Sequence, residues 1–260
     1  MVTKIWCFIW MTLEILIDGY TIIHFLKRLL VKVVFFYLTA KFFYQYCTEK
    51  KKSQSKSLVL DKDMLLLCEQ LQEDYKNQPE YIPSYAVELA ILTGMRVGEI
   101  AALTWDCISE DAILINKSEK YNRKTNAYFI DETKNKKERL FPMCDEISKL
   151  LAKVKKVELQ NGYICEWVFA NEEGRVHAPV ISSCIKNKCR QLGIEERGIH
   201  ALRKTFNSKI RNKGVAPIVA ATLLGHSVEV NQKYYTFDIT NNDEKRALVS
   251  SINETLPLAR

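Results

Sequence analysis

A run of nine polar residues, Glu49 to Ser57, divides the chain into two parts of different character. The segment before it, 1–48, is apolar and rich in aromatic residues, whereas apolar residues after it recur at helical and strand spacing. Lysine- and serine-rich runs of this kind are solvated and linker-like. We therefore predict a linker at 49–57, a folded domain at 58–240 and a C-terminal tail at 241–260.

The N-terminal segment holds two apolar stretches, Ile5 to Leu26 and Leu29 to Cys47. Both contain charged or titratable residues (Glu14, Asp18, His24, Lys32 and Lys41). A membrane-spanning helix needs about 20 mostly apolar residues, and a charge near its centre is costly. A signal peptide also fits poorly, because no small-residue cleavage site follows a short apolar run. We therefore favour a soluble or disordered appendage, with a membrane anchor as the alternative.

The net charge of +7 is concentrated in one segment. Lys186 to Lys213 holds nine basic residues against two acidic ones, a net of +7. Such a field favours a polyanionic partner that salt would release, although a solvated basic face is the alternative. The eight cysteines form no Cys-x-x-Cys pair, and no histidine cluster accompanies Cys184 and Cys189. We therefore predict no zinc site and reduced thiols, as in a cytosolic protein.

Mostly helical patterns follow the linker. Asp61 to Glu73 has apolar residues at helical spacing, and Pro83-Ser84 opens a second helix that runs to Leu92. Gly94 breaks that helix and lets the chain turn, so that Arg96 projects between two helices. Strands are expected at 112–115, 127–131 and 139–143, and further helices at about 145–158, 179–192, 200–213, 216–224, 228–235 and 241–253. The predicted fold class is mainly α with a small antiparallel β-sheet (α+β).

Two arginines and a lysine are suited to act on a phosphodiester. Such a reaction needs cationic donors for the non-bridging oxygens, a nucleophile, a base and an acid for the leaving oxygen. Arg96 and Arg203 fit the phosphate clamp, because guanidinium groups bind phosphate bidentately and stay charged. Glu99, three residues after Arg96, is placed to orient it. Lys134 in the polar loop 132–138 is the candidate acid, with Lys136 and Lys137 as rivals.

Two histidines and a tyrosine supply the remaining roles. His200 lies three residues before Arg203, so both face one side of a helix, where His200 could accept a proton or contact phosphate. His226 follows a glycine that permits a tight turn, and it could donate to a phosphate oxygen. Tyr235 is the candidate nucleophile, and cationic surroundings would favour its phenolate. Tyr234 is its rival, since consecutive helical residues point about 100° apart and only one can face the site.

The order and spacing of these residues resemble the motifs of the tyrosine recombinase, or phage integrase, family. The corresponding segments are Thr93 to Asp106 (first arginine box), Thr133 to Pro142 (lysine hairpin, with Lys134 at the catalytic place), His200 to Phe206 (His-x-x-Arg box) and Leu223 to Tyr235 (last box). The nine-residue interval from His226 to Tyr235 favours Tyr235 as the nucleophile. The resemblance covers residues 58–240, and all six expected polar positions are filled.

The resemblance implies a tyrosine recombinase catalytic-domain-like fold and a site-specific recombinase of the mobile-element integrase kind. The tyrosine would form a 3′-phosphotyrosyl link without ATP, metal or cofactor. Partners would be double-stranded DNA, a homo-tetramer on two DNA sites and accessory DNA-bending or excision factors. The tail 241–260 would dock on a neighbouring protomer, and the protein would act on DNA in the bacterial cytoplasm.

One departure from the family pattern keeps an alternative open. Members usually carry a helical core-binding domain before the catalytic one, and the segment 1–48 is too short and too apolar to resemble it. The alternative is a truncated, non-catalytic DNA-binding remnant of an integrase. A type IB topoisomerase would share the tyrosine chemistry, but the first-arginine and Leu-Gly-His boxes look more like those of integrases.

Overall fold

The structure is a computed structural model that describes residues 58–133, 138–240 and 242–254, and the single helical residues 37, 39 and 41. The chain divides into two compact units, residues 1–55 and 56–260. The predictions for the segment 1–48 and the linker 49–57 thus lie almost wholly outside the described residues. Within those described, every helix is too short or too polar to cross a bilayer.

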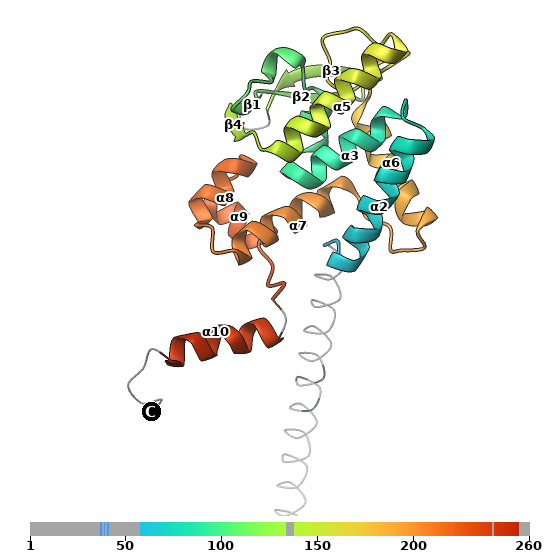
Figure 1. Cartoon of the computed structure of the whole chain (residues 1–260). Coiled ribbons are helices and arrows are strands. Elements are labelled where there is room, and N and C mark those ends of the chain that lie inside the picture. Colours follow the sequence, from blue (N-terminus) through green and yellow to red (C-terminus); the bar gives the residue numbers. More distant parts are fainter. Residues whose placement is uncertain are drawn as a thin grey trace, which may run out of the picture. The chain divides into compact units, whose positions relative to one another are not determined.

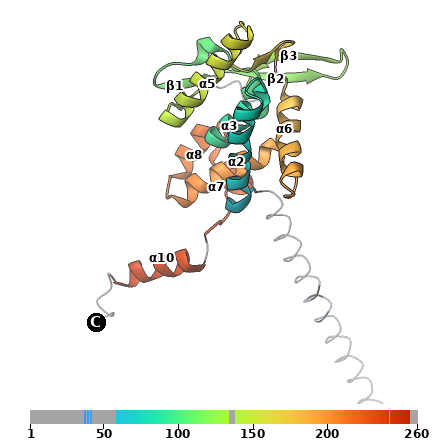
Figure 2. The same ribbon diagram turned by 45° about the vertical axis from the view of Figure 1, so that its right-hand side comes forward.

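Helix α3 (Ile82–Thr93) lies at the centre of the second unit. It contacts α2 (Asp61–Asn77), α5 (Asp145–Asn161), α6 (Ala178–Gln191) and α7 (Ile199–Asn212). Figures 1 and 2 show these helices around α3. Its sequence is apolar on nearly every face, which is why it can be buried on all sides. The helices predicted for these segments are confirmed to within a few residues.

The β-structure is antiparallel and built from short pairs. Strand β1 (Ala112–Ile115) pairs with β4 (Arg139–Pro142), so that Ile115 lies opposite Arg139. Strand β2 (Lys117–Asn122) pairs with β3 (Ala127–Glu132), and Figure 2 shows this hairpin extending past the helices. A small pair joins β5 (Ala170–Asn171) to β6 (Gly174–Arg175). Strand β2 was not predicted from the sequence, because its polar residues lack the apolar alternation by which a strand is recognised.

Glycines in the left-handed conformation end two helices beside the site. Gly94 (φ 62°) caps α3, and the chain then turns into α4 (Val97–Ala101), preceded by Arg96. Gly225 (φ 65°) caps α8 (Pro217–Leu224), and α9 (Val228–Tyr235) follows. The predicted turn at Gly94 is thus confirmed. A short 3-10 helix, η1 (Trp105–Cys107), follows α4.

The last helix, α10 (Asn242–Glu254), falls in the predicted tail. An ion pair joins Lys245 to Asp238, with 2.6 Å between Nζ and Oδ2. Where side chains of α10 are described, they are exposed. The docking of the tail on a neighbouring protomer stays a prediction.

Candidate active site

The side chain of Arg203 is buried at the centre of the site, with 1% of the residue exposed. Its Nη1 donates to the carbonyl of Gly94 at 2.7 Å, and its Nη2 donates to the carbonyl of Leu224. Both acceptors lie at helix C-termini, where unpaired carbonyls carry partial negative charge. Burial and the positive charge of Arg96 lower the pKa of Arg203 to about 9, so it remains charged at neutral pH. Arg203 therefore joins the ends of α3 and α8 through one cation.

A buried carboxylate, Glu99, holds the other predicted arginine. Arg96 Nη1 lies 2.8 Å from Glu99 Oε1, and the Arg96 backbone N–H donates to Glu99 Oε2 at 3.0 Å at the start of α4. Arg96 Nη2 donates to the Gly225 carbonyl at 3.2 Å. The predicted orientation of Arg96 by Glu99 is confirmed. Because a quarter of the Arg96 side chain stays exposed, it can still receive a ligand.

A third arginine, Arg139, completes this network from the start of β4. Its Nη1 and Nη2 donate to the two carboxylate oxygens of Glu99 at 3.1 and 2.6 Å, and its Nε donates to the Leu223 carbonyl at 3.0 Å. Burial by itself raises the pKa of Glu99, but Arg139, Arg96 and Arg203 outweigh it and lower that pKa to about 2. Glu99 is therefore ionised throughout the neutral range.

His226 occupies the turn between α8 and α9. Its Nε2 lies 2.7 Å from Arg203 Nη2, and because a guanidinium can only donate, Nε2 accepts and the ring proton sits on Nδ1. That Nδ1 is buried and has no partner among the described residues. Burial and the charges of Arg203, Arg96 and Arg139 lower the pKa of His226 to about 3. His226 is therefore a neutral ring with one N–H that makes no hydrogen bond to the described residues.

Tyr235 is the tyrosine that faces these groups. Its Oη lies 3.1 Å from His200 Nε2, its ring centroid is 4.0 Å from that of His226, and Arg203 Cζ is 5.6 Å from the ring. Tyr234 instead is 53% exposed, with Lys233 Nζ 5.2 Å from its ring. The structure thus brings Tyr235, and not Tyr234, to the two histidines and Arg203.

His200, at the start of α7, shares the face of that helix with Arg203, as their spacing predicts. Partial shielding of its ring from water, then the charges of Lys204, Arg203 and Arg96, lower the pKa of His200 below its usual 6.5. Its imidazole is therefore mainly neutral at neutral pH and can accept a proton from the Tyr235 hydroxyl.

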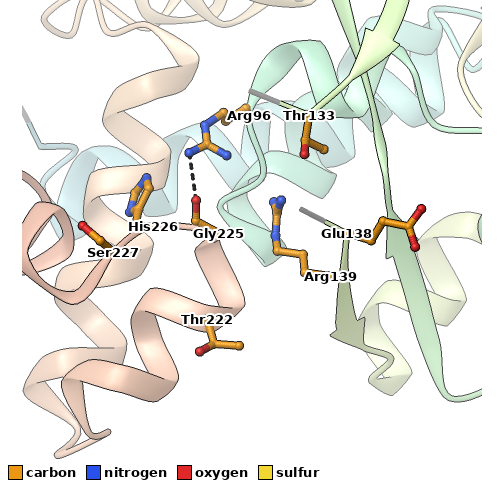
Figure 3. A pocket seen from close by; sticks show the side chains of 8 residues that line it. All are labelled: Arg96, Thr133, Glu138, Arg139, Thr222, Gly225, His226 and Ser227. Carbon is orange, nitrogen blue, oxygen red and sulfur yellow. Dashed lines mark hydrogen bonds between the residues drawn. The ribbon is translucent and has the colours of Figure 1, made fainter. Parts of the chain in front are cut away.

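Two pockets flank Arg96. One of about 430 Å³ is lined by Arg96, Arg139, His226 and Gly225, together with Thr133, Glu138, Thr222 and Ser227. Figure 3 shows the guanidinium groups of Arg96 and Arg139 beside Gly225 in this pocket. The other, of about 580 Å³, includes His200, Lys120 and Lys186 in its lining. Lys134 lies outside the described residues, whereas Thr133 and Glu138, the described residues on either side of 134–137, line the first pocket.

Residues 60–240 match the phage integrase family. The chain belongs to this family. It is 28% identical to the transposase from transposon Tn916 of Enterococcus faecalis, over an alignment that covers 72% of this chain and 53% of that protein. The transposase from transposon Tn1545 of Streptococcus pneumoniae matches with the same identity and coverage. The chain thus spans about half the length of the curated relatives it matches.

The fold is that of solved members of the family. The Tn1549 transposon integrase, determined in complex with transposon right end DNA, superimposes with a TM-score of 0.61 at 20% identity, over 75% of this chain and 66% of that one. The XerA recombinase gives a TM-score of 0.56 at 20% identity, over 75% and 62% of the two chains. The predicted fold class, mainly helical with small antiparallel sheets, is therefore confirmed.

For this member of the phage integrase family, sequence reasoning gave no role to Arg139. The signal was present, because Arg139 lies five residues after Lys134 in the segment that resembles the lysine hairpin. The contact with Glu99 cannot be read from spacing, since forty residues separate the partners.

Proposed function

We propose that this chain is a site-specific DNA recombinase, an integrase of a mobile element, that cleaves and rejoins DNA through a 3′-phosphotyrosyl link to Tyr235. The observation that carries the proposal is the position of the Tyr235 hydroxyl. It lies 3.1 Å from His200 Nε2, while the ring packs beside Arg203 and His226. A phenol between a neutral base and a fixed cation is placed to become a nucleophile.

In this mechanism the scissile phosphate binds where cationic and N–H donors converge. Arg96 is partly exposed beside both pockets and holds one non-bridging oxygen. Arg203 Nε and His226 Nδ1 are buried donors that have no partner among the described residues, and they serve the other oxygens. Donors fixed before the reaction stabilise the charge that develops on the phosphorane oxygens, without the cost of reorganisation.

The chemical step begins when His200 Nε2 accepts the proton of the Tyr235 hydroxyl. A bond forms from Tyr235 Oη to phosphorus, and the bond to the 5′-oxygen breaks. Lys134 donates a proton to that oxygen, which leaves as a hydroxyl. The 5′-hydroxyl of a partner strand then attacks the phosphotyrosyl link and restores both tyrosine and phosphodiester. Because bond energy is conserved, the cycle uses neither ATP nor a metal.

The remaining parts of the proposal concern partners. Double-stranded DNA is the substrate, and four protomers act on two sites, with accessory DNA-bending or excision factors. The catalytic domain is 58–240, the tail 241–260 docks on a neighbouring protomer, and the reaction takes place in the bacterial cytoplasm. The Tn1549 integrase, similar to this chain in fold, was determined bound to transposon DNA, which supports the choice of substrate.

The direct test traps the covalent intermediate. Wild type, Tyr235→Phe and Tyr234→Phe are incubated with a labelled suicide substrate, nicked near candidate attachment-site DNA from the flanking genome. We expect a denaturation-resistant adduct with wild type and Tyr234→Phe and none with Tyr235→Phe. Loss only in Tyr234→Phe would reassign the nucleophile. DNA binding by wild type without any adduct would instead favour the non-catalytic DNA-binding remnant.

A further inference from the structure

Two buried asparagines connect the helix that carries the tyrosine to the helix that carries the phosphate clamp. Asn207 lies on α7, four residues after Arg203, and Asn231 lies on α9, four residues before Tyr235. Both are 0% exposed. Asn231 Nδ2 donates to Asn207 Oδ1 at 2.7 Å, and Asn207 Nδ2 donates to the Tyr235 carbonyl at 2.8 Å.

The direction of this chain of hydrogen bonds is fixed by its end. The Tyr235 carbonyl can only accept, so the Asn207 amide must present its nitrogen there and its oxygen to Asn231. Asn231 must therefore present its own nitrogen. The Thr236 hydroxyl lies 3.3 Å from Asn231 Oδ1 and 3.1 Å from the Asn231 carbonyl oxygen, and it can donate to either. The Tyr235 carbonyl thus determines the orientation of both amides.

The Tyr235 carbonyl has a reason to need this partner. Tyr235 is the last residue of α9, and Thr236 is already extended, so the carbonyl lies among those that a helix end leaves unpaired. It receives a second hydrogen bond from Ser208 Oγ at 3.2 Å. Ser208 Oγ in turn accepts from the Phe237 backbone N–H at 3.2 Å. The end of α9 is thus tied to α7 by directional bonds on both sides of Tyr235.

We propose that Asn207 and Asn231 are positioning residues that fix the Tyr235 hydroxyl relative to His200 and Arg203. The inference rests on the proposed function and names the groups that orient its nucleophile. Apolar side chains would bury the same interface, but hydrogen bonds have direction and hold one register between helices. Because His200, Arg203 and Asn207 lie on one helix, a shift of α9 along α7 changes the tyrosine's distance to both the base and the clamp.

The decisive variant is Asn231→Asp, which keeps the shape of the side chain. An ionised carboxylate cannot donate to Asn207 Oδ1, and turning the Asn207 amide would only move the clash to the Tyr235 carbonyl. A protonated carboxyl can donate, and burial favours that form. If the hydrogen bond from residue 231 to Asn207 positions Tyr235, the cleavage rate of Asn231→Asp should rise when its carboxyl is protonated. If residue 231 only fills space, the protonation of its carboxyl should not affect the rate.

The assay measures single-turnover cleavage of the suicide substrate at saturating DNA for wild type, Asn231→Asp and Asn231→Ala. A nucleophile displaced by about 1 Å can cost about 100-fold in rate, and we expect a loss of that order for both variants at about pH 8. Relative to wild type, Asn231→Asp should recover toward about pH 5.5 as its carboxyl protonates, whereas Asn231→Ala should not. An Asn231→Asp rate equal to wild type at the higher pH, or a deficit that follows that of Asn231→Ala at every pH, would overturn the proposal.

A matched control separates positioning from general loss of stability. Thr205 also lies on α7, is 3% exposed, and its Oγ1 accepts from the Val59 backbone N–H at 2.9 Å, away from the tyrosine. Thr205→Ala should lower the midpoint of thermal unfolding as Asn207→Ala does, but keep the wild-type cleavage rate below that midpoint. Equal loss of cleavage in both variants would contradict a positioning role.

A second readout does not need activity. The ring NMR resonances of Tyr235 in the DNA-free protein can be assigned by comparison with Tyr235→Phe. In Asn207→Ala we expect these resonances to shift, whereas those of Tyr234 should not. In Thr205→Ala the resonances of both tyrosines should stay unchanged. Unmoved Tyr235 resonances would overturn the positioning role even if wild type cleaves. If wild type binds DNA without forming an adduct, the proposed function fails. The NMR resonances would still show whether the two asparagines position Tyr235.

Discussion

Replacing Arg139 with methionine should destabilise the protein and remove most of the loss of stability in acid that comes from Glu99. Glu99 is 1% exposed, and Arg139 supplies two of its hydrogen bonds. A carboxyl whose pKa falls from 4.5 to about 2 contributes about 3 kcal/mol to the free energy of unfolding at neutral pH. Removing one partner of a buried ion pair typically costs about 3–5 kcal/mol, which is of the same order.

The pH dependence follows from the sign of that pKa change. Because the folded-state pKa of Glu99 lies below 4.5, its contribution is present above about pH 5 and is lost as pH falls toward about 2. In Arg139→Met, the arginine no longer offsets the effect of burial, which raises the pKa of Glu99. The pKa of Glu99 therefore rises, and most of the loss of stability in acid that comes from Glu99 disappears. Urea unfolding of wild type and variant from about pH 3 to pH 7 measures both effects.

Arg175→Met is a matched control, because Arg175 makes a comparable ion pair with the buried Glu119, at 3.0 Å, away from Tyr235. Both variants should lose stability, but only Arg139→Met should lose cleavage beyond that explained by unfolding, since Glu99 also orients Arg96. The reasoning is refuted if Arg139→Met unfolds at the wild-type urea concentration at neutral pH. It is also refuted if Arg175→Met loses cleavage to the same extent.

Three further predictions use other parts of the structure. Gly225→Ala should lower the free energy of unfolding in urea by about 1–2 kcal/mol more than Gly214→Ala does. Both glycines have positive φ, but a Cβ at Gly225 would lie 3.0 Å from an arginine nitrogen, whereas nothing lies within 4 Å of a Cβ at Gly214. Lys204→Ala removes a positive charge that lowers the pKa of His200, so that pKa should rise and the increase of the cleavage rate with pH should move to higher pH. An unchanged pH profile would show that His200 is not the base. Glu158→Gln should stabilise the protein by about 1–3 kcal/mol above about pH 7, and less as pH falls toward about 5, because burial raises the pKa of this 3% exposed carboxyl to about 7. Thermal unfolding across that range tests it, and an equal effect at every pH would contradict it.

Sequence patterns indicated which residues lie near Tyr235 better than they indicated which residues connect the helices around it. His200 and Arg203 were placed on one helical face by their spacing, and Tyr235 was preferred to Tyr234 by its distance from His226. These are local relations that helix geometry determines. The contacts of Arg139 with Glu99 and of Asn207 with Asn231 join distant segments, and no local pattern indicates which polar residues meet across a core.

The basic segment shows a different limit of sequence reasoning. A net charge of +7 in Lys186 to Lys213 predicts a polyanion-binding face, yet Lys188, Arg197 and Arg203 are buried. Lys188 forms an ion pair with the buried Asp74, at 2.6 Å, and so serves the packing of α6 against α2. Charge counts cannot separate such residues from exposed ones, because a long basic side chain can occupy either environment.

Helix α7 explains why the site depends on burial as much as on charge. Its residues His200, Arg203 and Asn207 contact the hydroxyl, the ring face and the carbonyl of Tyr235, respectively. A helix is stiff along its length, so three contacts to one residue leave that residue little freedom to move relative to any of them. Arg203 donates to the ends of α3 and α8 inside a core that keeps water away from it, where such hydrogen bonds are stronger than in water. The same contacts that hold the helices together therefore also set the position of Tyr235, the proposed nucleophile. Weakening these contacts should lower both the stability of the protein and its rate of cleavage.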